Sequence, residues 1–231
     1  DVYDTLFIIK NRDNVEVWYW VNGLNGYDKY FQTNDGVSSL TTDANVMTVS
    51  GTTITLGSTL LNDNYVVECH RAGAAGGAAN TDGTNITSTV SVNSVTGFVV
   101  GTYTGTGTVD DSIGTGLSTA LDFALIQRTN DDRSTAVYHS SATGDGSGLY
   151  WQTDNGNNNS NTSACFRTVD ATTMQFGDNS QMNGSSDTYV FLGWHGVEGY
   201  SAFGTYEGNG SATDGSFISV GFKPASIVFK S

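Results

Sequence analysis

A glycine-rich pattern, G-T-Y-x-G-x-G, occurs twice in the chain, at Gly101–Gly107 and at Gly204–Gly210. Glycine-rich loops can bind phosphate, but a P-loop ends in G-K-[ST] and a dinucleotide-binding loop opens a helix. Neither segment contains a lysine, and neither leads into a helical pattern. We therefore interpret both as turns after strands, where glycine adopts positive φ at little cost.

Aromatic side chains beside amides and carboxylates form the second candidate. A sugar ring stacks on an aromatic face, while its hydroxyl groups need directional partners. Trp18 and Trp20 alternate along an expected strand and so share a face, and Tyr150-Trp151 precedes a run rich in Asn and Asp. The predicted ligand-binding residues are Tyr150, Trp151, Asp154, Asn155, Trp18 and Trp20. Packing in the core is the alternative for each aromatic residue.

Catalysis would need a converging set of histidines or acids. The histidines are His70, His139 and His195, and the first and last occupy equivalent strand positions in a repeat described below. Such symmetry favours a role in the scaffold over a catalytic one. Glu198 and Glu207 could serve as a pair of glycosidase-type carboxylates, which keeps an extracellular glycan hydrolase as a lesser alternative. We expect no enzymatic activity and assign no catalytic residue.

No cofactor is expected, and calcium is an alternative that two polar segments raise. Carboxylate and amide oxygens suit calcium, and they cluster at Asp154, Asn155, Asn157 and Asn159 and at Asp131-Asp132. Neither segment has the spacing of a calcium-binding loop, so solvated turns are favoured. Cys69 and Cys165 lack zinc-site spacing, and we expect two buried free thiols, with a single bridge as the alternative.

Composition narrows the class of protein. The chain has 231 residues and a formal net charge of −14, with only nine Lys and Arg. A partner with a phosphate backbone needs a basic surface, so nucleic acid is disfavoured, as is an anionic membrane. No apolar run reaches the roughly 18 residues of a membrane helix, so no membrane insertion is expected. The chain begins with Asp1, which suggests a processed or excised chain.

Internal similarity is the most informative feature of the sequence. Five segments recur in the same order, which favours an ancestral duplication. The pairs are Asp4–Asn14 with Leu121–Asp131, Tyr30–Gly36 with Tyr150–Gly156, Gly51–Gly57 with Ala171–Gly177, Asp63–Gly73 with Asp187–Val197, and the two glycine-rich segments. A further segment, Ala225–Lys230, resembles the opening strand of each unit, so the chain also ends on one.

The repeat predicts an all-β fold of two tandem antiparallel β-sandwich units, jelly-roll or concanavalin-like. Short period-two segments separated by Gly/Asn turns are typical of such sandwiches. The first unit should span residues 1–115, with an insertion near 71–97 that forms a loop or an added hairpin, and the second should span residues 116–231. One merged domain is the alternative.

Residues Thr188–Ser231 resemble a β-rich repeat of tail-fibre and other virion-associated proteins of marine bacteriophages. The resemblance lies in W-H followed by G-Y-S-x-F-G-x-Y-x-G-N-G, then D-G-x-F and G-F-x-P-A-x-V-x-x-K. Modules of that family are similar to concanavalin-like and laminin-G-like sandwiches. The resemblance implies a non-enzymatic structural protein at the virion surface or outside the cell, in a fibre, spike or capsid-decoration element. Its expected partners are other virion proteins and further copies of itself. The alternative is an adhesin that binds a host surface glycan.

Overall fold

The computed structural model describes residues 3–16, 18–32, 40–60, 62–141, 149–150 and 165–229. Within these residues the chain consists mainly of antiparallel strands in four sheets. The five-stranded sheet has the order β4 (Thr41–Thr42), β3 (Lys29–Gln32), β2 (Trp18–Asn22), β1 (Tyr3–Asn11), β7 (Tyr65–Ala74). The seven-stranded sheet has the order β14 (Leu149–Tyr150), β13 (Ala136–His139), β12 (Phe123–Arg128), β17 (Thr188–Trp194), β10 (Phe98–Thr104), β9 (Ser88–Asn93), β8 (Ala78–Asn80).

Two smaller sheets and two short helical turns complete the elements. The three-stranded sheet has the order β11 (Ser112–Gly114), β16 (Thr173–Phe176), β15 (Phe166–Val169), and the two-stranded sheet pairs β5 (Met47–Ser50) with β6 (Thr53–Leu56). The helical turns are the 3-10 turn η1 (Ser58–Leu60) and α1 (Ser180–Asn183). The predicted all-β fold class is confirmed.

Alternation along the strands divides the apolar residues among three cores. In β1, Leu6 and Ile8 point into the core between the five-stranded and seven-stranded sheets, while Phe7 and Ile9 point to the opposite face. That opposite face is covered by the β5–β6 hairpin and η1 through Met47 and Leu60 among others. A third core lies between the seven-stranded and three-stranded sheets. The sheets therefore form stacked layers, and the central strands of the two large sheets alternate between the cores on their two faces.

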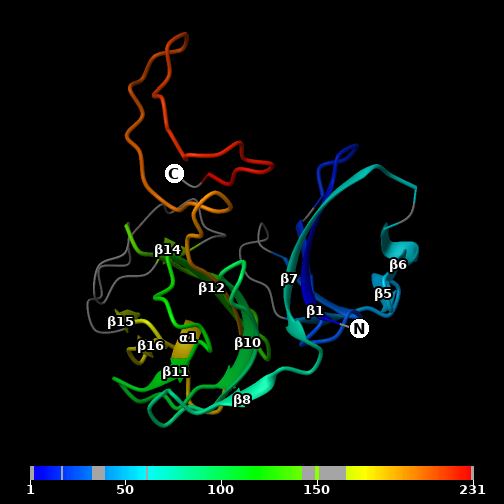
Figure 1. The fold of residues 1–231 in the computed structure, drawn as a ribbon. Coiled ribbons are helices and arrows are strands. Elements are labelled where there is room, and N and C mark those ends of the chain that lie inside the picture. The colour runs from blue at the N-terminus through cyan, green and yellow to red at the C-terminus, as the bar shows by residue number, and fades with distance from the viewer. Residues whose placement is uncertain are drawn as a thin grey trace.

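The layers can be followed in Figure 1. The blue and cyan strands of the five-stranded sheet lie beside the green strands of the seven-stranded sheet, with β11, β15, β16 and α1 on the far side. After β17 the described chain contains no strand, only a single bridge between Val197 and Ser201. This C-terminal segment, residues 196–229 and hereafter the tail, extends beyond the ends of the sheets.

The sheets do not divide at the expected unit boundary near residue 115. Strands β8, β9 and β10 precede that boundary but pair with β17 and its neighbours, which follow it. The insertion near 71–97 contains β8 and β9, which extend the seven-stranded sheet at its edge. The segment around the boundary contains β11, where Ile113 is fully buried. Strands of both predicted units therefore share one sheet.

Each half of the chain, meaning each predicted unit, has an opening strand (β1 or β12) that pairs with a closing strand (β7 or β17). The two pairs have the same register. In the first half, β1 pairs with β7 so that Leu6 lies opposite His70 and Ile8 opposite Glu68. In the second half, β12 pairs with β17 so that Phe123 lies opposite Trp194 and Leu125 opposite Leu192. Residues matched by the repeat therefore occupy the same places in the two pairs, and we call such residues counterparts. Ancestral duplication itself stays a prediction.

Further counterparts share backbone conformation and contacts. Asn62 and Ser186 both have positive φ, at 81° and 64°. Directly after them, Asp63 accepts a hydrogen bond from Asn11 Nδ2 at 2.8 Å, and Asp187 pairs with Arg128 at 2.6 Å. In each half a carboxylate at the start of the closing strand therefore ties down the end of the opening strand.

Candidate functional site

The predicted aromatic and Asn/Asp patch falls largely outside the described residues. Tyr150 belongs to β14 at the edge of the seven-stranded sheet, where its backbone lies opposite Ala136. Its side chain, and Trp151, Asp154 and Asn155 altogether, lie outside the described part of the chain. Ligand binding at these four residues stays a prediction.

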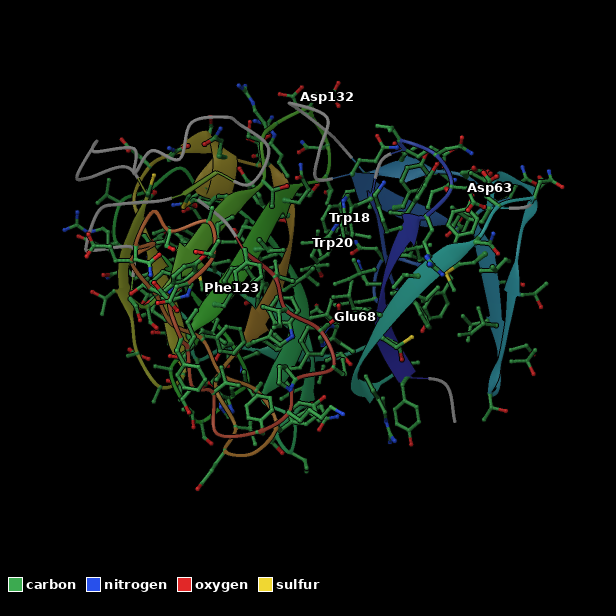
Figure 2. The ribbon with its side chains drawn as sticks, turned by 90° about the horizontal axis from the view of Figure 1, so that it is seen from above. Trp18, Trp20, Asp63, Glu68, Phe123 and Asp132 are labelled. Carbon is green, nitrogen blue, oxygen red and sulfur yellow. The ribbon has the colours of Figure 1, made fainter. Side chains whose placement is uncertain are left out.

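Trp18 and Trp20 share a face of β2, as expected, but lie at different depths (Figure 2). Trp20 is 5 % exposed, because it packs in the core between the two large sheets and stacks on Phe31 at 5.9 Å between ring centroids. Trp18 is 41 % exposed, with Lys10 Nζ 6.0 Å from its ring centroid. The alternative of core packing thus holds for Trp20, and of the two indoles only Trp18 is exposed.

A hydrogen-bonded chain connects the two large sheets near the start of the tail. Trp194 Nε1 donates to His70 Nδ1 at 3.3 Å, and His70 Nε2 lies 2.9 Å from Glu68 Oε1. Because the indole can only donate, Nδ1 must accept, so the proton of a neutral His70 lies on Nε2 and is directed at Glu68. This hydrogen bond is the main reason why the pKa of Glu68 is lowered.

These two hydrogen bonds fix His70 in place and leave neither of its ring nitrogens free to contact a substrate. The ring also packs 5.5 Å from Phe98 and 5.5 Å from Trp194 between centroids, which joins β7 to β10 and β17. Its counterpart by register is Trp194 and not His195, so the expected equivalence of the two histidines is wrong by one residue. We infer a role in packing the sheets together.

The other titratable residues singled out from the sequence are dispersed. His139 lies on β13, where burial lowers its pKa, and His195 Nδ1 lies 2.9 Å from Gly196 O. Glu198 and Glu207 are both exposed in the tail. Asp131 contacts the guanidinium groups of Arg128 and Arg133 at 3.6 Å and 3.4 Å. No group of three or more His, Cys, Asp or Glu within the described residues could hold a metal ion.

The remaining candidates are the carboxylate and amide segments considered for calcium and the two cysteines. The polar segment with Asp154, Asn155, Asn157 and Asn159 lies outside the described residues, so a calcium role there stays a prediction. Asp132, of the Asp131-Asp132 pair, lies in a different part of the molecule from Asp63 (Figure 2). Cys69 and Cys165 are both free thiols, as expected, but only Cys165 is buried, because Cys69 lies on the edge strand β7.

The two glycine-rich segments have opposite environments. In the first, a Cβ on Gly101 would lie 2.1 Å from the Phe191 ring, and Gly105 N donates to Asp187 O at 2.8 Å. Tyr103 between them stacks on Tyr189 with the centroids 5.0 Å apart. In the second, Gly204, Gly208 and Gly210 have no neighbouring heavy atom within 4 Å of an added Cβ, and Tyr206 is 56 % exposed. One copy is therefore a packed strand and turn, and the other is open to solvent.

The tail as a whole exposes large apolar side chains. The exposed residues are Tyr200, Tyr206, Phe217, Ile218, Ile227, Val228 and Phe229, with Phe217 at 93 %. Single exposed apolar residues are common on folded proteins, but gathered ones mark interaction surfaces. The tail is therefore the candidate functional site that the geometry supports best, as a surface for contact with another protein.

The sequence held a signal for this surface that the site predictions missed. The chain contains three segments of the opening type, at Leu6–Lys10, Phe123–Gln127 and Ala225–Lys230. Of the described residues in the third segment, 225–229, none belongs to a strand. An apolar strand pattern without a partner predicts an unpaired, exposed segment.

The comparisons with known proteins identify a family and name no activity. Residues 2–231 match the model of a domain of unknown function, DUF7483, and the chain belongs to this family. Searches of curated proteins and of solved structures found no match. Within the described residues, no helix is long and apolar enough to cross a membrane.

Proposed function

We propose that this chain is a non-enzymatic structural module of a bacteriophage virion, in an external fibre, spike or capsid-decoration element, and that it acts by assembling with further copies and other virion proteins. The family-like motif of Thr188–Ser231 supports the virion assignment. The observation that carries the assembly role is the exposed apolar tail.

The tail fits a subunit contact better than a solvent-facing terminus. Phe217, Ile227, Val228 and Phe229 are each more than 60 % exposed, although such side chains gain about 1.5–3 kcal/mol each when fully buried. The body has three packed cores, and none of these four exposed side chains belongs to them. A partner that buries these side chains would recover the unrealised free energy.

Light scattering over a concentration series tests the assembly role. The wild-type chain should form oligomers, and Phe217→Ser should shift the equilibrium toward monomer because it removes the most exposed aromatic side chain. The matched control is Val95→Ser, an 82 % exposed apolar residue outside the tail, which should leave the equilibrium unchanged. A wild-type monomer at every concentration would refute the proposal.

The virion assignment has its own test. Mass spectrometry of purified phage particles from the source should detect peptides of this chain at a stoichiometry typical of a structural component. Their absence from intact particles would contradict the virion role while leaving the assembly role standing.

Glycan binding is the second candidate function, and the exposed indole of Trp18 favours it. Trp18→Ala should abolish binding on a host glycan array without changing the thermal midpoint, while Trp18→Phe should keep part of it. Release of reducing ends from host polysaccharide by the wild-type protein would instead indicate the hydrolase alternative.

A further inference from the structure

We propose that residues 201–206 of one copy add as an antiparallel strand to the outer edge of β7 in a second copy. The inference rests on the assembly role proposed above and deepens it, because it names the surface, the partner and the register. Strand addition to a sheet edge is a recurring mode of recognition, in which backbone hydrogen bonds supply affinity and side chains supply specificity.

β7 and its counterpart β17 differ in their neighbours. β17 lies between β12 and β10, whereas β7 pairs with β1 alone among the described strands. The consequence is visible in burial: Val66 and Val67 of β7 are 54 % and 42 % exposed, while their counterparts Val190 and Phe191 are 1 % and 0 % exposed. The place that β10 fills beside β17 is therefore open beside β7. An open edge is a template for an added strand.

The open part of the edge is limited to the first part of β7. Near its end, Asn93 Nδ2 donates to Arg71 O at 3.0 Å and Ser91 Oγ donates to Ala74 O at 3.3 Å, so β9 covers that end. No described strand pairs with the outer edge of residues 65–70. A strand of six residues, the length of 201–206, matches this stretch.

The tail carries a copy of the strand that the edge lacks. Ser-Ala-Phe-Gly-Thr-Tyr at 201–206 repeats Phe-Val-Val-Gly-Thr-Tyr at 98–103, the main part of β10. In β10, Tyr103 lies opposite Tyr189, Gly101 opposite Phe191 and Val99 opposite Gly193. We replace each residue of β10 by its match in the tail and each residue of β17 by its counterpart in β7. The same register then places Tyr206 opposite Tyr65, Gly204 opposite Val67 and Ala202 opposite Cys69. Gly204 would then leave room for Val67, as Gly101 does for Phe191.

A second contact follows from the same repeat. Ser112-Ile113 aligns with Ser216-Phe217, one residue out of step with the glycine-rich match, and Ile113 on β11 lies opposite Met174 on β16. The counterpart of Met174 is Ile54 on β6, so Phe217 would lie opposite Ile54. Ile113 and Met174 are both fully buried, whereas Phe217 and Ile54 are 93 % and 44 % exposed. The tail thus carries one candidate partner for the edge of β7 and another for the exposed Ile54 of β6.

The occupant is a second copy because the start of a chain's own tail lies beside β12 and not beside β7. Gly196 N donates to Asp122 Oδ2 at 2.7 Å, and Phe203 stacks on Phe123 with centroids 5.9 Å apart. These contacts keep the start of the tail beside β12, from which it extends beyond the sheets (Figure 1). Within the described residues, Ser226 Oγ of the tail donates a hydrogen bond to Glu68 Oε1 of its own β7 at 3.0 Å. Because donor and acceptor surfaces differ, the contact either is exchanged reciprocally in a two-fold dimer or continues head-to-tail into rings or filaments.

Disulfide trapping between two different proteins tests the register. The donor is the variant Ala202→Cys with Cys69→Ser, and the acceptor is the wild-type chain with its exposed Cys69. After mild oxidation of the mixture, non-reducing electrophoresis and peptide mass spectrometry should find a disulfide between position 202 of the donor and Cys69 of the acceptor. Paired Cα atoms on adjacent strands lie about 4.5–5.5 Å apart, within the range that a disulfide spans.

The matched control donor is Thr205→Cys with Cys69→Ser. Position 205 should lie opposite Val66, about 10 Å along the strand from Cys69, which is too far for a disulfide. Equal trapping by both donors would overturn the inference. So would a disulfide within one chain in the single variant Ala202→Cys, because the tail would then fill its own edge. Absence of trapping in a wild-type protein that light scattering shows to be oligomeric would refute this contact but not the assembly role. Absence of both trapping and oligomers would refute both.

Discussion

Gly101 lies where β10 packs closely against the side chain of Phe191 on β17. A Cβ at Gly101 would lie 2.1 Å and 2.4 Å from two atoms of the Phe191 ring, which is itself fully buried. Gly101→Ala should therefore lower the free energy of unfolding by about 1–3 kcal/mol, the usual cost of overpacking a core. Urea denaturation of the variant and the wild type measures this difference in the free energy of unfolding.

Gly204 is the matched control for that substitution, because it is the counterpart of Gly101 and nothing lies near its Cβ position. Gly204→Ala should leave the stability of the dilute monomer within about 0.5 kcal/mol of wild type. It should nevertheless weaken assembly, since Gly204 is expected opposite Val67. A loss of monomer stability as large as that of Gly101→Ala would contradict the open environment of the tail.

Two stacked tyrosines predict alkaline unfolding. Burial raises the pKa of Tyr189 to about 12, and burial raises that of Tyr103 well above its ordinary value. Because the folded state holds these protons more tightly, their contribution to stability is complete below about pH 10 and is lost as the pH rises through about 12. Unfolding followed by circular dichroism should therefore show stability falling across this interval.

Tyr189→Phe should flatten that alkaline fall. It should also lower stability at pH 7 by about 1–3 kcal/mol, because the phenol accepts from Gly184 N at 2.8 Å and donates to Ser180 O at 2.6 Å. A variant with the same alkaline profile as wild type would show that Tyr189 does not cause the loss.

At the scale of elements, the core between the two large sheets makes the halves interdependent. Leu125 on β12 is 1 % exposed and packs in this core with residues of β1, β2 and β3. Leu125→Ala should lower the free energy of unfolding by about 2–5 kcal/mol. Because β10 joins the sheet of β12 and β17, the variant should still unfold in one transition by calorimetry. Separate transitions for residues of the two sheets would contradict this interdependence.

The sequence predicted the positions of the strands better than it predicted which strands pair with one another. Period-two runs such as Leu6–Ile9 define strands locally, and the repeat matched β1 with β12 and β7 with β17. The pairing of β10 with β17 was not predictable, because the apolar pattern of β10 suits either sheet and the choice depends on contacts distant in sequence. The same reason separates Trp18 from Trp20: identical residues on one strand face differ in burial because the second sheet covers only one of them.

At the scale of the whole molecule, charge opposes the association that the tail promotes. Each chain carries a formal charge of −14, so two copies repel at low ionic strength. Salt shortens the screening length from about 30 Å at 0.01 M to about 8 Å at 0.15 M. Sedimentation velocity should therefore show tighter association as sodium chloride rises over this range. Dissociation by salt would indicate an interface held by ion pairs instead of backbone and apolar contacts.

The central claim is that copies of this chain assemble by placing the tail of one beside β7 of the next. An electron cryomicroscopy reconstruction of the assembled protein tests it most directly. The account predicts a strand antiparallel to residues 65–70 of β7 that is continuous with residue 194 of a neighbouring copy, with Phe217 of that copy against β6. An assembly in which the edge of β7 is bare, or is filled by the tail of the same chain, would contradict it.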